Sequence, residues 1–250
     1  MAQARGSHET AELRDIAFVG HAGSGKTTLI ETLLHRAGAI PSAGSIAKGN
    51  TVCDFGEQER RLQHSLEVGI CELEHDGKLV NLLDTPGYPD FLGRTLAALP
   101  AVDTVAVVVN AQNGVELVTQ RVMDFAARRR LCRLIIVNKI DAEGVDLAEV
   151  LAQIRSSFGE ECLPINLPAR SGEAVADCFF EPADAVPDFS SCAAAHTEIR
   201  DRIIELDDAL MEPYLEQGEE ISLEQLHDPF ERALRRGHLV PVCFVSAETG

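Results

Sequence analysis

Basic residues are scarce in this sequence. Its 250 residues include 22 Lys and Arg against 40 Asp and Glu, which gives a formal net charge of −18. A surface this acidic is repelled by phosphate backbones, so we expect no extended nucleic-acid binding by this chain alone. The simplest interpretation of the acidic excess is solubility.

Long apolar runs and paired cysteines are also missing. Every apolar run is broken well before the length that crosses a bilayer, and the polar first residues have no signal-peptide core, so we expect no membrane span. The seven cysteines form no C-x-x-C pair and the eight histidines lack metal-ligand spacing, which argues against a disulfide framework and a zinc site. Free thiols are typical of a reducing compartment, so we expect a cytoplasmic protein.

What is present is an alternation of short apolar runs with helical patterns. Apolar segments rich in β-branched residues predict six strands, at residues 14–20, 66–73, 78–84, 103–111, 133–141 and 239–247. Strands that alternate with helices predict an α/β fold. We expect a mostly parallel six-stranded sheet with helices on both faces.

The pattern changes after Gly159. Residues 160–237 contain proline, alanine and short apolar pieces with little period, and we interpret them as an inserted α/β subdomain before the last strand. The main domain then comprises 1–159 and 238–250. A closing helix normally covers the last strand of such a domain, so we expect the chain to be a fragment of a longer protein.

The end of this insertion carries helix signals. Ser222 with Gln225 predicts a capping box. Asp228 followed by Pro229 predicts a helix start, and Gly237 predicts the end of that helix.

The stretch "GHAGSGKTTL" follows the first predicted strand and opens a helix. Gly20, Gly25, Lys26 and Thr27 match G-x-x-x-x-G-K-[ST], in which glycines let backbone N–H groups point at a phosphate. We expect Lys26 at the β- and γ-phosphates and the Thr27 hydroxyl on Mg²⁺. The predicted phosphate loop comprises His21, Ala22, Gly23, Ser24, Gly25, Lys26, Thr27 and Thr28. The motif does not distinguish ATP from GTP, or hydrolysis from transfer.

The stretch "NKID" lies at the end of the fifth predicted strand and favours guanine. The Asp141 carboxylate can accept both the N1–H and the 2-amino group of guanine, whereas adenine would leave it unpaired at a cost of about 1–3 kcal/mol. We expect Asn138 to tie this loop to the phosphate loop and the Lys139 stem to lie along the base. The backbone N–H groups predicted to meet guanine O6 belong to Ser246, Ala247 and Glu248. This preference argues against a P-loop kinase or ATPase.

The stretch "DTPG" follows the third predicted strand. We expect Asp84 to hold Mg²⁺ through a water, and the Gly87 N–H to contact the γ-phosphate and so sense its presence.

These motifs, in this order, resemble the GTP-binding domain of translation elongation factor G and its bacterial paralogues. The matching stretches are "GHAGSGKTTL", "DTPGYPDF", "NKID" and "PVCFVSAE". Residues 49–66 resemble the segment that contains the first switch, and the insertion resembles the G′ subdomain. The resemblance implies a P-loop NTPase fold and a cytoplasmic factor that uses GTP and Mg²⁺ on the ribosome. Further domains would make most ribosomal contacts, and in that family the insertion can contact ribosomal stalk proteins.

Three positions depart from the family pattern. Tyr88 stands where the family usually has the histidine that positions the attacking water, and a phenol is a poor base at neutral pH. Ser65 aligns with the switch threonine that contacts Mg²⁺, and Gly23 replaces an aspartate of the phosphate loop. Since the family commonly has histidine at His21, we interpret that residue as structural. His64 could approach the phosphate in an ordered switch.

Two functions follow from this pattern. The first is a GTPase with Tyr88, Gly87 and Lys26 as catalytic residues and a slow intrinsic rate, because the ribosome normally supplies the activating arrangement. The second is a GTP-responsive binding switch with little hydrolysis, because Tyr88 replaces the usual histidine. A third possibility, a P-loop kinase or ATPase, is disfavoured by "NKID". Tighter binding of ATP than of GTP would support it.

Overall fold

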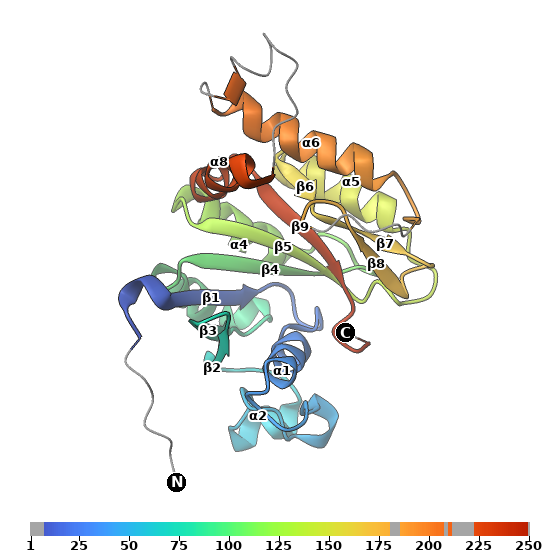
Figure 1. Cartoon of the computed structure of the whole chain (residues 1–250). Helices are drawn as coiled ribbons and strands as arrows, with labels where there is room; N and C mark the ends of the chain where they lie inside the picture. The colour runs from blue at the N-terminus through green and yellow to red at the C-terminus, as the bar shows by residue number, and fades with distance from the viewer. Residues whose placement is uncertain (1–7, 181–185, 208–209, 212–222, 250) are drawn as a thin grey trace.

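A seven-stranded sheet forms the centre of the protein (Figure 1). The structure, a computed structural model, describes residues 8–180, 186–207, 210–211 and 223–249. The strand order is β2-β3-β1-β4-β5-β9-β6, and all neighbours are parallel except β2 and β3. These strands are β1 Leu13–Val19, β2 Gly69–His75, β3 Lys78–Asp84, β4 Thr104–Asn110, β5 Cys132–Asn138, β6 Cys162–Pro164 and β9 Val240–Val245. The predicted α/β fold with a mostly parallel sheet is confirmed.

The predicted number of six strands is wrong by one. The additional strand, β6, is three residues long and pairs with β9, with Cys162 opposite Val240. It was missed because it lies in a segment without clear apolar period, where only its neighbour β9 makes it a strand. The first residues of the predicted insertion therefore extend the main sheet. The division of the chain into domains stays a prediction.

Helices cover both faces of the sheet, as expected. The described α-helices are α1 Lys26–Arg36, α2 Glu57–Leu62, α3 Leu92–Ala98, α4 Leu117–Arg128, α5 Leu147–Phe158, α6 Cys192–Glu205 and α8 Leu223–Arg236, of which α2 lies away from the sheet (Figure 1). Successive residues of β1 point to opposite faces, so Phe18 packs in one core with Ile30 of α1, and Val19 packs in another with Val122 of α4. In the described ranges, no helix is both long and apolar enough to span a membrane.

The described residues between β6 and β9 add a hairpin and the helices α6 and α8. Strands β7 Asn166–Ala169 and β8 Ala174–Asp177 form a separate antiparallel pair. Helices α6 and α8 pack on each other around a third core that includes Ile199, Leu226 and Leu239. In Figure 1 they lie at the β9–β6 end of the sheet, away from α1 and α2.

Helix α8 does not begin where the sequence suggested. Pro229 lies inside it, so the predicted start at Asp228-Pro229 is wrong. A proline removes one backbone hydrogen bond from a helix, but Leu226, Pro229 and Ala233 are buried on one side of α8, and this packing outweighs the loss. Gly237, at φ +70°, follows the last helical residue as predicted. Ser222 of the predicted capping box lies outside the described residues.

Candidate nucleotide-binding site

The four predicted motif loops meet at one edge of the sheet. They follow the carboxyl ends of β1, β3, β5 and β9, which all run in the same direction in the sheet. Open α/β sheets bind ligands at this edge. Segments more than 200 residues apart in sequence are joined here, since Thr32 of α1 donates its hydroxyl to the Ala247 carbonyl at 2.7 Å, across 215 positions.

Close packing explains two glycines of the phosphate loop. Gly20 has φ +138°, and a Cβ there would lie 2.2 Å from the Val108 carbonyl oxygen. Gly25 has φ +91°, and its Cβ would lie 2.3 Å from Nδ2 of Asn138. Any larger residue would be strained in backbone and would push the loop off the sheet. The glycines therefore let the loop lie against both β4 and the base loop.

Lys26 places a buried ammonium inside this loop. Its side chain is 6% exposed, and Nζ donates to the carbonyl oxygens of Gly20 and His21 at 3.0 Å each. Burial lowers the pKa of Lys26 to about 8, although the carboxylates of Asp84 and Asp54 act in the opposite direction. An anionic phosphate beside Nζ would favour the charged form.

Three oxygen-bearing side chains converge next to Lys26. The Thr27 hydroxyl donates to Asp84 Oδ2 at 2.5 Å and lies 3.5 Å from the Ser65 hydroxyl. Asp84 is fully buried, and its Oδ1 finds no hydrogen-bond partner among the described residues. Burial raises the pKa of Asp84 to about 7, and the hydrogen bond from Thr27 limits the rise.

This donor set fits Mg²⁺. A buried carboxylate oxygen without a partner and two hydroxyls are hard ligands of the kind that Mg²⁺ prefers. No group of three or more His, Cys, Asp or Glu among the described residues could hold a metal ion. Mg²⁺ commonly takes only one or two carboxylates and completes its shell with phosphates and water.

A cavity of about 300 Å³ lies over the phosphate loop. Its lining brings together many of the predicted site residues: Ala22, Gly23, Gly25, Lys26, Thr27, Thr28, Ser65, Gly87, Tyr88 and Lys139. It is also lined by Ile46, Asp54, Gln63 and His64. A Cβ on Gly87 would lie 2.5 Å from Lys26 Nζ and 2.7 Å from the Ala22 nitrogen, so Gly87 packs closely against the phosphate loop. Its contact with the γ-phosphate stays a prediction.

Sequence reasoning missed the acidic residues that hold the switch segment in place. Glu59 of α2 is buried, and its Oε1 accepts the backbone N–H groups of Leu66 and Glu67 at 3.0 and 3.2 Å. Its Oε2 accepts from Gly56 at 3.1 Å. Glu31 of α1 likewise accepts two backbone N–H groups of residues 44–52. No sequence motif identifies these glutamates, because they bind backbone N–H groups, which nearly every residue type has.

Asp54 is a further acidic residue in the cavity wall. It is 4% exposed, and burial raises its pKa, while a hydrogen bond from Ser65 lowers it. It shares the cavity with Lys26 and was not singled out from the sequence.

Asn138 joins the loops at the predicted base end. Its Nδ2 donates to the Ser24 carbonyl and its Oδ1 accepts from the Ala247 N–H, both at 2.9 Å. The expected tie between the base loop and the phosphate loop is therefore present. Asp141 and Glu248 are exposed and are not part of the cavity lining.

His21 and Tyr88, whose side chains were considered from the sequence as possible water-positioning groups, point to different places. His21 turns toward the loop before α4, where its Nε2 lies 3.6 Å from Oε1 of Glu116. Tyr88 lines the cavity, is 41% exposed, and has its ring centroid 4.6 Å from that of His64.

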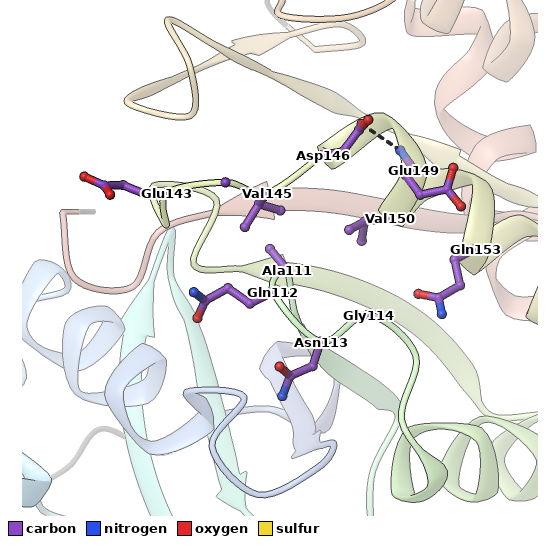
Figure 2. Close-up of a pocket in the computed structure, with 11 residues that line it drawn as sticks. Ala111, Gln112, Asn113, Gly114, Glu143, Val145, Asp146, Glu149, Val150 and Gln153 are labelled. Carbon is purple, nitrogen blue, oxygen red and sulfur yellow. Dashed lines mark hydrogen bonds between the residues drawn. The ribbon is translucent and has the colours of Figure 1, made fainter.

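A second pocket of about 430 Å³ lies between the loop after β4 and the start of α5 (Figure 2). Two of its polar side chains already serve the local backbone. Asp146 caps α5 by accepting the Glu149 N–H, and Gln153 accepts the Val115 N–H. The phosphate-loop cavity, where the predicted motifs meet, is therefore the candidate site.

Comparison with known proteins agrees with this geometry. The family described as "Elongation factor Tu GTP binding domain" matches residues 11–250. The chain belongs to this family. An elongation factor G-like protein of Mycobacterium tuberculosis is 36% identical over 95% of this chain and 35% of its own length. A peptide chain release factor 3 of a Cyanothece species is 29% identical over 99% of this chain and 48% of its own length.

A solved crystal structure has a similar fold. A protein of Thermus thermophilus superposes with a TM-score of 0.86 at 37% identity, over 96% of this chain and 38% of that chain. The chain thus spans between about a third and a half of the relatives it matches. As a member of the elongation factor Tu GTP-binding domain family, it is a translational GTPase domain with a P-loop α/β fold.

Proposed function

We propose that this chain binds GTP and GDP with Mg²⁺ and hydrolyses GTP, as the GTP-binding domain of an elongation factor G-like factor that acts on the ribosome. The observation that carries the proposal is a cavity lined by Lys26, Thr27 and Ser65. The Thr27 hydroxyl lies 3.5 Å from that of Ser65 and donates to the buried carboxylate of Asp84. Lysine, hard oxygen ligands and backbone N–H groups are what a nucleoside triphosphate with its cation requires.

Each group has a defined task in this proposal. Lys26 neutralises the β- and γ-phosphates, where negative charge builds up during phosphoryl transfer. Thr27, Ser65 and Asp84 hold Mg²⁺, which when bound shields the phosphate charge. The Gly87 N–H contacts the γ-phosphate. Guanine is recognised by Asp141, and the nucleotide-binding set is His21, Ala22, Gly23, Ser24, Gly25, Lys26, Thr27, Thr28, Asn138, Lys139, Asp141, Ser246, Ala247 and Glu248.

The same site supports a second candidate, a GTP-responsive switch with little hydrolysis. Tyr88 lies at the cavity, where it can hydrogen-bond a water but acts poorly as a base. Replacing Tyr88 with histidine separates the two candidates. A large gain in ribosome-stimulated phosphate release in Tyr88→His favours the switch, and an unchanged or lower rate favours the GTPase.

The ribosome is the proposed partner because of the relatives. One of them is a mitochondrial ribosome-releasing factor 2 of Drosophila willistoni, 30% identical over 95% of this chain, and another is a peptide chain release factor 3. We place the factor in the cytoplasm, with ribosomal contact mainly through regions outside this chain and with stalk proteins meeting residues 160–237. Extended nucleic-acid binding by this chain is not part of the proposal, since its net charge is −18.

Phosphate release tests the proposal directly. The full natural protein is incubated with GTP, with and without ribosomes, and released phosphate is measured over time. We expect slow release alone and faster release with ribosomes. Calorimetry with GDP is a second test, and no heat of binding would contradict nucleotide recognition itself.

A further inference from the structure

We propose that His64, on the switch segment, supplies the imidazole that orients the attacking water, in place of a histidine at position 88. This inference rests on the proposed GTPase function. It assigns Tyr88 the role of a platform for His64 and explains how a phenol can stand at that position in a hydrolysing enzyme.

The backbone directs His64 toward the cavity. Helix α2 ends at Leu62, and the φ of +58° at Gln63 then turns the chain sharply. Gln63, His64 and Ser65 then line the cavity that also contains Lys26 and Tyr88. The proposed water-positioning imidazole is thereby adjacent in sequence to a proposed Mg²⁺ ligand and lines the same cavity as the proposed phosphate contacts.

Aromatic packing holds the His64 ring. Its centroid is 4.6 Å from that of Tyr88, with 54° between the ring planes, and 6.3 Å from that of Phe91. These distances are typical of aromatic pairs in contact. The loop after β3 therefore contacts the switch segment through rings, and Tyr88 supports His64 from the side of "DTPG".

Buried acids fix the backbone around His64. The His64 N–H donates to the Glu59 carbonyl at 3.3 Å, and the Glu59 carboxylate binds the backbone at Leu66 and Glu67. On the other side of His64, the Ser65 hydroxyl lies 3.5 Å from that of Thr27. A backbone held on both sides of His64, with the ring packed on Tyr88, leaves the imidazole little further entropy to lose when it binds a water, which is what positioning requires.

The chemistry needs a hydrogen-bond acceptor more than a strong base. The water oxygen forms a bond to the γ-phosphorus while the bond from phosphorus to the β–γ bridging oxygen breaks. An imidazole nitrogen of His64 accepts a hydrogen bond from the water and aligns it, and the water proton passes to an oxygen of the γ-phosphoryl group. GTP and water thus give GDP and phosphate with no net change at His64. Alignment and charge stabilisation dominate such transfers.

Four forms of the full natural protein test the assignment: His64→Ala, Tyr88→His, the double variant, and His75→Ala as control. His75 has a side chain 74% exposed at the β2–β3 turn, so its removal tests the loss of a histidine away from the cavity. GTP hydrolysis with ribosomes is measured at several GTP concentrations. GDP affinity of each form shows whether the site is folded.

We expect His64→Ala to lower kcat about tenfold or more with KM for GTP nearly unchanged, and His75→Ala to match the wild type. The double variant should recover most of the lost rate, because the histidine at position 88 restores an imidazole. A purely structural role for His64 predicts no such recovery.

Different results overturn different statements. A wild-type protein that releases no phosphate contradicts the proposed GTPase, and the role of His64 with it. A wild-type protein that hydrolyses GTP while His64→Ala keeps its rate contradicts the role of His64 alone. The same holds if His64→Ala is slow and the double variant is equally slow while both bind GDP normally, because the loss is then one of switch packing.

Discussion

The phosphate end and the base end of the proposed site are built on opposite principles. At the phosphate end, Lys26 and Asp84 are buried. Burial lowers the pKa of Lys26 and raises that of Asp84, and both shifts favour the neutral form. At the base end, Asp141, which we propose recognises guanine, is exposed. The first end holds charges at a cost that a ligand would offset, whereas the second leaves its charge in water until the base arrives.

The difference separates affinity from selectivity. Changes at the phosphate end should alter both the binding of all nucleotides and the stability of the free protein. Changes at the base end should alter only which base is accepted. The following predictions test this separation.

Asp141→Asn should have the largest effect. We expect GDP affinity to fall at least about a hundredfold, because the two guanine donors then face an amide that can accept only one of them. Xanthosine diphosphate, which presents a carbonyl oxygen in place of the 2-amino group, should bind the variant better than GDP. The measurement is calorimetry with both nucleotides.

The control for this change is Glu143→Gln, an exposed acid on the same loop. It should leave both affinities and the free energy of unfolding within about 0.5 kcal/mol of the wild type. If Asp141→Asn also behaves this way, the base end does not recognise guanine through Asp141.

Lys26→Met should come next. We expect affinity for GDP and for xanthosine diphosphate to fall by similar factors, about 10- to 100-fold, since charge-assisted bonds to phosphate are lost. The free energy of unfolding without nucleotide should not fall, because a buried charge is replaced by an apolar chain of similar length. Urea unfolding measures it, with the exposed Lys48→Met as control. If Lys26→Met lost stability but kept its nucleotide affinity, Lys26 would serve folding and not phosphate binding.

Over a single pH unit, the pH dependence of stability should show the smallest effect. Asp84 has a pKa of about 7 in the folded protein against an ordinary value of 3.8, so between these values the folded state holds a proton that the unfolded state has lost. The contribution of Asp84 therefore falls as pH rises from about 4 to about 7, by at most about 1.4 kcal/mol per pH unit. Urea unfolding of wild type and Asp84→Asn without nucleotide or Mg²⁺ isolates it. If the free energy of unfolding varied with pH in the same way in both proteins, the raised pKa of Asp84 would be excluded.

The motif loops could be predicted because short stretches of sequence determine them. The positive φ of Gly20 and Gly25 is a local requirement that only glycine meets easily, and it is visible as a spacing in the sequence. Once each motif is placed after a strand, the parallel order brings the loops to one edge. The join made by Asn138 follows from the same reasoning and is present.

The missed features depend on contacts between distant or unpatterned residues. Strand β6 needs β9 beside it, and Pro229 is accepted in α8 because Leu226 and Ala233 pack on the same side. Glu59 looks like any glutamate of an exposed helix, yet it turns inward to bind the backbone at Leu66. Such roles are set by tertiary packing, which leaves no period or motif in the sequence.

The amide of Asn138 makes three loops one mechanical unit. This amide hydrogen-bonds to Ser24 in the phosphate loop and to Ala247 in the loop after β9. Both bonds are buried, so moving one loop outward alone would break a bond and leave a buried polar group unpaired, which costs about 1–3 kcal/mol. Loosening is therefore shared among them. If the proposed site binds a nucleotide, a partner that displaces any one of these loops, even one far from the phosphates, should weaken binding of the whole nucleotide.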